Sequence, residues 1–204
     1  MSTAQKLDPP KRRYTPDEYL RLERDAEQKH EYFEGKIFAM AGGTARHNLI
    51  AGNMYSALRR EIRKRNCQAF VSDMKVRISE SDLYTYPDVA VACGEIEYGS
   101  DIEDVLLNPR VLVEVLSKST ESRDRGWKFQ QYQKLPSLVD YVLVSQDQPL
   151  VERFTRQANG NWVLTNFAGL EATFSLTAIE CPLTLAELYL DVEFGEEEPA
   201  NEIL

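Results

Sequence analysis

The chain has 204 residues, of which 43% are hydrophobic and 28% charged, and its net charge is −9. This composition is typical of a globular domain with a substantial core and excludes a largely disordered chain. No apolar run approaches the ~20 residues of a membrane span, and the N-terminus lacks the apolar region of a signal peptide, so we expect a cytoplasmic protein with no membrane partner.

The negative charge is concentrated near the C-terminus. Residues 191–204 contain six acids and no base, and the remaining chain has a net charge of only −3. The total charge argues against a nucleic-acid partner, but a nearly neutral body leaves such a partner open. We therefore predict a flexible leader at residues 1–13, a single domain at residues 14–190 and an acidic tail at residues 191–204.

Helix signals are strong in the first third of the chain. Thr15-Pro16-Asp17-Glu18 supplies an N-cap, a proline at the first helical position and a capping-box glutamate, which predicts a helix to about Glu27. Residues 31–40 favour a strand that is bent or paired at Gly35. A second helix is predicted from His47 to Arg65, with His47 on the apolar face formed by Ile50, Met54, Ala57, Leu58 and Ile62.

Strand signals dominate the middle of the chain. Candidate strands at residues 68–78, 87–93 and 110–117 precede a long helix at residues 120–135 and another apolar strand at residues 138–145. Asn159-Gly160 between two strand-like runs predicts a β-hairpin, and a short helix opens at Thr184. This order predicts an α/β (α+β) fold, in which helices flank a mixed central sheet and a C-terminal β-hairpin is added.

Two further sequence features bear on function. Residues 59–65 include five basic side chains, which favour either a solvated helix end or a phosphate-binding patch. Cys67, Cys93 and Cys181 are widely separated and lack CxxC spacing, so we expect three reduced core cysteines and no zinc site.

An acid inside an apolar strand is the strongest functional signal. Glu114 lies within Val111-Leu112-Val113-Glu114-Val115-Leu116, a run expected to be buried on both faces. Burying an ionised carboxylate costs several kcal/mol, roughly, unless a cation or hydrogen-bond donors meet it. Asp88 opens the preceding apolar strand. Two carboxylates at neighbouring strand ends can hold a hard divalent cation, so we predict a Mg²⁺ site at Asp88 and Glu114, where Mn²⁺ would substitute.

The chain resembles the Uma-type family of restriction-endonuclease-like proteins in the PD-(D/E)xK nuclease superfamily. The resemblance covers residues 14–145 and rests on several segments in the right order: Tyr14 to Tyr19, His30 to Gly35, His47, Pro87-Asp88-Val89, Glu114 to Ser117 with Ser119-Thr120, Asp124 to Lys128, and Tyr132. It implies a magnesium-dependent nuclease fold with the helix, three strands, helix, strand core.

The chain departs from the superfamily pattern at the site lysine. The pattern places a lysine two residues after the strand glutamate, where this chain has Leu116. Lys118 has the same strand parity but lies about 13 Å along the strand from Glu114. Lys128 belongs to the helix face that should pack on the sheet, and some superfamily members carry the lysine on this helix. We therefore predict Lys128 as the site lysine; the alternative is a simple ion pair of Lys128 with Asp124.

Supporting roles are weighed in the same way. Glu31 matches the acid on the family's preceding strand and could bind metal or orient Lys128, whereas Glu34 beside Gly35 favours a turn position. His47 is as consistent with a hydrogen-bonded core histidine as with a site residue. Ser117 could donate to Glu114 or end its strand.

The resulting hypothesis is a Mg²⁺-dependent DNA endonuclease with Asp88, Glu114, Lys128 and Glu31 as its catalytic residues. The alternative is an inactive nuclease-fold module that binds nucleic acid or a protein partner. A third hypothesis is a purely structural oligomer, with the hairpin around Asn159-Gly160 making the contact. A homodimer is expected in either case, since many nucleases of this type dimerise.

Overall fold

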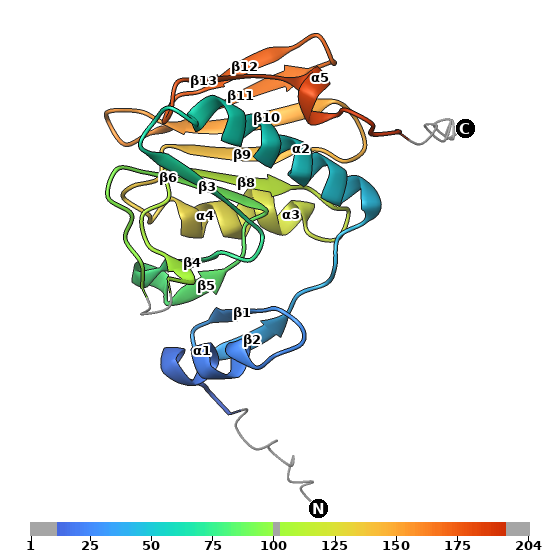
Figure 1. The fold of residues 1–204 in the computed structure, drawn as a ribbon. Coiled ribbons are helices and arrows are strands. Elements are labelled where there is room, and N and C mark those ends of the chain that lie inside the picture. Colours follow the sequence, from blue (N-terminus) through green and yellow to red (C-terminus); the bar gives the residue numbers. More distant parts are fainter. Residues whose placement is uncertain (1–11, 100–102, 195–204) are drawn as a thin grey trace, which may run out of the picture.

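The computed structural model describes residues 12–99 and 103–194, and its centre is a six-stranded mixed sheet (Figure 1). The strand order is β11-β10-β9-β8-β6-β3, and only β8 and β9 are parallel. A mixed sheet was predicted and is confirmed. Its strands are β3 (Cys67–Val71), β6 (Val89–Cys93), β8 (Val111–Val115), β9 (Asp140–Val144), β10 (Leu150–Arg156) and β11 (Trp162–Ala168).

Helix α2 (Ala45–Ile62) covers one face of this sheet. Its buried residues are those of the predicted apolar face, Ile50, Met54, Ala57, Leu58 and Ile62. The hairpin β12 (Thr173–Leu176) and β13 (Cys181–Thr184) and the helix α5 (Leu185–Leu188) complete this core. The hairpin of β10 and β11 is confirmed, whereas that of β12 and β13 was not predicted from the sequence.

The opposite face is covered by residues 121–132, which the sequence predicted as part of one α-helix. The segment instead comprises α3 (Glu121–Arg123), the π-helical turn η2 (Asp124–Lys128) and α4 (Phe129–Tyr132). The wider π-turn buries both Asp124 and Lys128 in the same turn. Such turns are rare and often mark functional sites, and a 3.6-residue period does not reveal them.

A second sheet, in the order β2-β1-β5-β4-β7, lies beyond this helical segment. Its strands are β1 (His30–Phe33), β2 (Lys36–Ala39), β4 (Lys75–Ile78), β5 (Leu83–Thr85) and β7 (Val105–Leu106), with the 3-10 turn η1 (Ser79–Ser81) before β5. Helix α1 (Pro16–Arg24) packs beside them through a cluster of buried tyrosines. The capping box predicted at Thr15 and Glu18 is present.

One strand prediction in this region is confirmed in its paired form, and another needs correction. The strand expected at residues 31–40 is the β1–β2 hairpin, which turns at Glu34 and Gly35 with φ of 46° and 82°. The strand expected at residues 68–78 is split between the two sheets. Between residues 94 and 109, where the sequence predicts no strand, the structure contains β7, which is too short to give a periodic signal.

The prediction of three reduced cysteines is wrong for two of them. Cys67 and Cys93 are cross-strand partners on β3 and β6, and they form a disulfide, whereas Cys181 is free and buried. The antiparallel register brings the two sulfurs together, and this pairing is not visible in their separation along the chain.

The predicted leader and tail fall largely at residues 1–11 and 195–204, which lie outside the described residues, so the domain boundaries stay predictions. Within the described part of the chain, no helix has the length and apolarity needed to cross a membrane.

Candidate functional site

The site is built around Glu114, which β8 directs toward the helical segment at residues 121–132. Its strand neighbours Val113 and Val115 belong to the core on the α2 face, so alternation along the strand places Glu114 on the other face. The carboxylate is 4% exposed, lies 2.7 Å from Lys128 Nζ and accepts a 2.7 Å hydrogen bond from the Tyr132 hydroxyl. The buried acid therefore has both a cation and a donor.

Lys128 is the central cation of the site. Besides Glu114, its Nζ lies 3.7 Å from Asp124 Oδ1 and 3.8 Å from Glu31 Oε1. Burial opposes the charge of the ammonium, but these three carboxylates outweigh burial and raise the pKa of Lys128. The sequence left Lys118 as an alternative; that side chain is exposed.

Burial is the main cause of the raised pKa of Glu114, and neighbouring acids add to it. Burial raises the pKa of Glu114 to about 8, and Asp124 and Asp88 add to the shift against the opposing charge of Lys128. Several acids facing one ammonium leave a negative site in a dry environment. Such a site favours a further cation.

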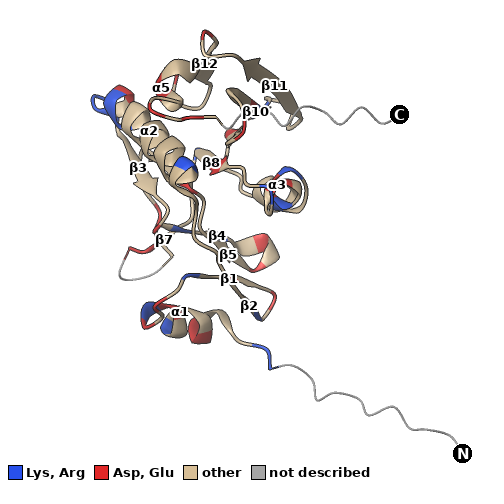
Figure 2. Ribbon diagram, turned by 90° about the vertical axis from the view of Figure 1, so that its right-hand side faces the viewer, with Lys and Arg blue, Asp and Glu red and all other residues tan. Residues whose placement is uncertain are grey.

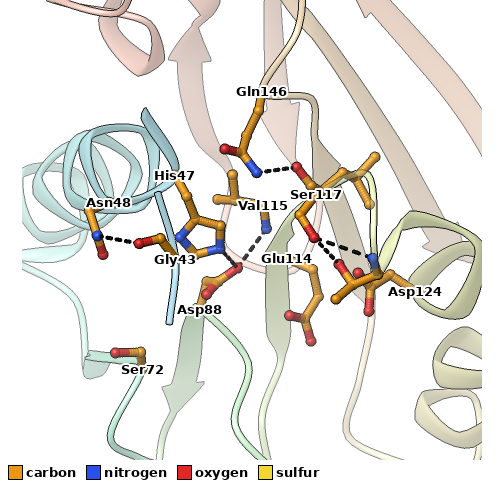
Figure 3. Close-up of polar contacts among 12 residues, drawn as sticks. Gly43, His47, Asn48, Ser72, Asp88, Glu114, Val115, Ser117, Asp124 and Gln146 are labelled. Carbon is orange, nitrogen blue, oxygen red and sulfur yellow. Dashed lines mark hydrogen bonds and ion pairs between the residues drawn. The ribbon is translucent and has the colours of Figure 1, made fainter. Parts of the chain in front are cut away.

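Asp88 faces Glu114 from the neighbouring strand. Val89 pairs with Val113, and extending this antiparallel register by one residue sets Asp88 opposite Glu114. The Asp88 Oδ2 atom accepts hydrogen bonds from the Val115 N–H at 2.7 Å and from His47 Nε2 at 3.2 Å (Figure 3). One carboxylate oxygen is thus held by donors from β8 and from the first turn of α2.

Glu31 approaches Lys128 from the second sheet. It is 3% exposed, accepts a short hydrogen bond from the Thr85 hydroxyl and pairs with Arg123 at 2.5 Å. Burial alone would raise its pKa, but Lys128 and Arg123 reverse that effect, and the pKa of Glu31 is lowered. Glu31 therefore carries a charge that helps to hold Lys128 in place.

The structure separates the supporting residues predicted from the sequence. His47 contacts Asp88, and the bond with Asp88 raises the pKa of His47 against the effect of burial. Asp124 lies near Lys128, as expected if the two formed a simple ion pair, but Glu114 is the nearer partner of the lysine. The Ser117 hydroxyl forms hydrogen bonds with Ser119 and Thr120, which fits the predicted role of Ser117 in ending its strand. Glu34 is exposed in its turn and does not line the groove described next.

A groove of about 1240 Å³ opens above these residues. Its walls come from the β1–β2 hairpin, the N-terminal end of α2, the β3–β4 turn and the helical segment. Its acidic and basic lining residues are Glu31, Asp88, Glu114, Asp124, Lys29, His47, Arg123 and Lys128.

The donor set fits a hard divalent cation with few protein ligands. Among residues 12–99 and 103–194, no group of three or more His, Cys, Asp and Glu side chains is arranged to hold a metal. Mg²⁺, however, needs only one or two carboxylates and keeps waters or substrate phosphate as its other ligands. Asp88 and Glu114, opposed on adjacent strands and open to the groove, would be those ligands.

The basic residues at 59–65 lie away from this site. They are at the C-terminal end of α2, whereas His47 is in its first turn, about 23 Å away at 1.5 Å per helical residue. Figure 2 shows this basic end of α2 apart from α3. Arg60 is also paired with Glu61 and Glu187. This arrangement favours the solvated-helix-end interpretation.

Sequence reasoning did not predict roles for Tyr132, Thr85 and Arg123. Tyr132 lies four residues after Lys128 on the same helical face, which is a usable signal. Thr85 and Arg123 reach Glu31 only through pairing between distant segments, for which the sequence offers no local signal.

The mixed sheet flanked by helices, with opposed acids on adjacent strands, defines a restriction-endonuclease-like fold. A family model described as Uma2, "Putative restriction endonuclease", matches residues 16–192. The chain therefore belongs to the Uma2 family.

Relatives and a solved structure agree with this assignment. The chain is 37% identical to the uncharacterized proteins slr1290 and sll1609 of Synechocystis, over 75% and 78% of its length and 80% and 89% of theirs. The crystal structure of "a putative nuclease belonging to DUF820" from Anabaena variabilis matches with a TM-score of 0.68 at 21% identity, covering 85% of this chain and 96% of that one. The latter likeness shows the fold, as predicted.

Proposed function

We propose that this protein is a Mg²⁺-dependent DNA endonuclease whose metal ligands are Asp88 and Glu114. The observation that supports this most strongly is the buried Glu114, set opposite Asp88 and 2.7 Å from the Lys128 ammonium. Nothing about folding requires an acid in this strand, whereas phosphodiester hydrolysis needs concentrated charge at one place. Family membership supports the nuclease class.

The proposed reaction is attack of water on a phosphodiester phosphorus. A new P–O bond to the water oxygen forms as the bond to the leaving ester oxygen breaks; the water proton passes to solvent or to a nearby base, and the leaving oxygen takes up a proton from solvent to become a hydroxyl. Bound Mg²⁺ supplies charge stabilisation and an acidified water. Lys128 orients the water or stabilises charge on the phosphoryl oxygens, and Glu31 holds Lys128 in position.

Calorimetry with Mg²⁺ and Mn²⁺ tests the metal site. We expect heat of binding in the wild type and its loss in Glu114→Gln and Asp88→Asn. Glu34→Gln is the matched control, because Glu34 is an exposed acid outside the groove. Equal binding by wild type and Glu114→Gln would contradict the site.

Cleavage of plasmid DNA with either metal tests the activity. Glu114→Gln and Lys128→Ala should lose cleavage, and Lys118→Ala, which alters an exposed lysine near the same strand, should retain it. Cleavage that survives both Asp88→Asn and Glu114→Gln would overturn the proposal.

The alternative function is a nuclease-fold module that binds nucleic acid or a protein without turnover. It is favoured by the tight pairing of Lys128, which is 5% exposed and is shared among three carboxylates. This alternative predicts DNA binding without metal-dependent cleavage, which the same plasmid assay distinguishes.

The homodimer and the cytoplasmic location expected from the sequence stay predictions. Edge strand β11 supports a dimer contact, because Val163 and Leu164 are each 47% exposed and the strand carries no charge. Long uncharged edges readily pair with a second chain. Sedimentation of the wild type and of Val163→Lys tests this contact. The wild type should be a dimer and the variant a monomer, and a dimer in both would contradict an interface at β11.

A further inference from the structure

We infer that the groove accepts an unpaired DNA strand rather than a duplex. This inference names the substrate class of the proposed nuclease site and so rests on the proposed function. It is carried by three features: the depth of the reacting groups, the small number of available cations around them, and the aromatic and apolar side chains on the groove walls.

The reacting groups lie on the floor of the groove. Glu114 and Lys128 are 4% and 5% exposed, and Glu31 and Asp124 are each 3% exposed. The β1–β2 hairpin and the first turn of α2 rise around them. A phosphodiester must descend to this floor to react, and a single strand can do so because its backbone is not tied to a complementary strand.

The charges on the groove walls do not suit a duplex. Duplex-binding proteins commonly neutralise several phosphates with lysine and arginine. Three lysine and arginine side chains line this groove, of which Lys128 is buried, leaving Lys29 and Arg123 at 41% and 42% side-chain exposure; His47 also lines it and is paired with Asp88. The basic residues at 59–65 are at the far end of α2. The lysine and arginine side chains of the groove can therefore neutralise only a few phosphates.

The walls instead carry side chains suited to unpaired bases. Phe38 on β2 is 45% exposed and lines the groove, and Val71 from β3 lines it with the same exposure. The Arg123 guanidinium lies 4.8 Å from the ring centre of Trp127, which also lines the groove; Tyr86, 5.6 Å from Lys29 Nζ, is only 6% exposed and supports the lysine instead of offering a free face. Aromatic rings interleaved with cations are the usual surface for single strands, because every base has a face that can stack.

The test compares binding of one labelled DNA oligonucleotide, roughly 16 nucleotides long, as a single strand and as a duplex. Fluorescence anisotropy on Glu114→Gln, a variant that should not cleave, separates binding from turnover. We expect tighter binding of the single strand. We also expect a shallow salt dependence, with a slope of about −1.4 in log K against log salt if Lys29 and Arg123 each neutralise one phosphate.

Phe38→Ala in the same background tests the stacking surface and should weaken single-strand binding by between about 5- and 100-fold. Leu170→Ala is the matched control, because Leu170 is similarly exposed, at 44%, and lies outside the groove. A duplex bound as tightly as the single strand, or unchanged affinity in Phe38→Ala, would overturn this inference. Failure of the nuclease proposal would appear separately, as absence of cleavage by the wild type.

Discussion

The two faces of strand β8 are both almost fully buried but differ in chemistry. Val111, Val113 and Val115 pack into an apolar core beneath α2. On the other face, Glu114 lies between Leu112 and Leu116, which belong to a second apolar cluster, and it faces Lys128 and Tyr132. Burial alone therefore does not make a face purely apolar, since one strand supports apolar packing on one side and a charge cluster set among apolar side chains on the other.

Removal of the Lys128 cation should have the largest effect on the stability of the charged face. Lys128→Ala leaves Glu114, Glu31 and Asp124 buried without their shared partner, and losing one member of a buried ion pair costs about 3–5 kcal/mol. We expect that decrease in the free energy of unfolding by urea denaturation without metal. Lys118→Ala should change it by less than about 0.5 kcal/mol. Similar stability in the two variants would mean that the cluster is not dry.

The second-largest effect should be a pH dependence of stability that arises from the charged face of β8. The pKa of Glu114 is raised to about 8 from an ordinary value near 4.5. A group with a raised folded-state pKa contributes stability that is fully present below its unfolded pKa and is lost as pH rises through its folded pKa. Stability of the metal-free protein should therefore fall as the pH rises from about 4.5 to about 8, by at most about 5 kcal/mol from this group.

Glu114→Gln should flatten that fall, which urea titrations at several pH values would reveal. Saturating Mg²⁺ should restore stability of the wild type at high pH, because the ion binds the deprotonated carboxylate. Parallel pH profiles for wild type and Glu114→Gln would contradict the assigned shift.

Truncation on the apolar face should have a smaller effect of a different kind. Val113→Ala removes two methyl groups from a fully buried side chain and should cost about 2 kcal/mol. Metal affinity and cleavage by the folded fraction should be unchanged, as calorimetry and rates measured below the unfolding transition would show. Loss of metal binding in this variant would mean that the two faces are coupled.

Removal of one hydroxyl should have the smallest effect. Tyr132→Phe deletes the 2.7 Å hydrogen bond to Glu114 but leaves Lys128 in place. We expect a loss of about 1 kcal/mol in stability, measured by urea denaturation, since one donor to the carboxylate remains. A loss as large as that of Lys128→Ala would make the tyrosine, rather than the lysine, the main partner of the acid.

The sequence was sufficient for features that depend on local periodicity. Glu114 stands out in an apolar run, and the helical spacing of Lys128 and Tyr132 directs the lysine toward the sheet. Features created by pairing between distant segments were not predictable. The Cys67–Cys93 disulfide depends on strand register, the contact of His47 with Asp88 depends on where α2 begins over the sheet, and the second sheet joins strands too short to carry a pattern. The π-turn at Asp124–Lys128 was hidden because it changes the helical period itself.

The position of the lysine on a helix has a consequence for how the site assembles. Glu114 belongs to the sheet layer and Lys128 to the layer packed on it, so their ion pair exists only when the two layers are docked. Leu116, where the superfamily pattern has its lysine, is instead part of the apolar interface between those layers. The ion pair and the docking of residues 121–132 therefore form together, so local undocking of that segment would separate Lys128 from Glu114 while the sheet remained folded.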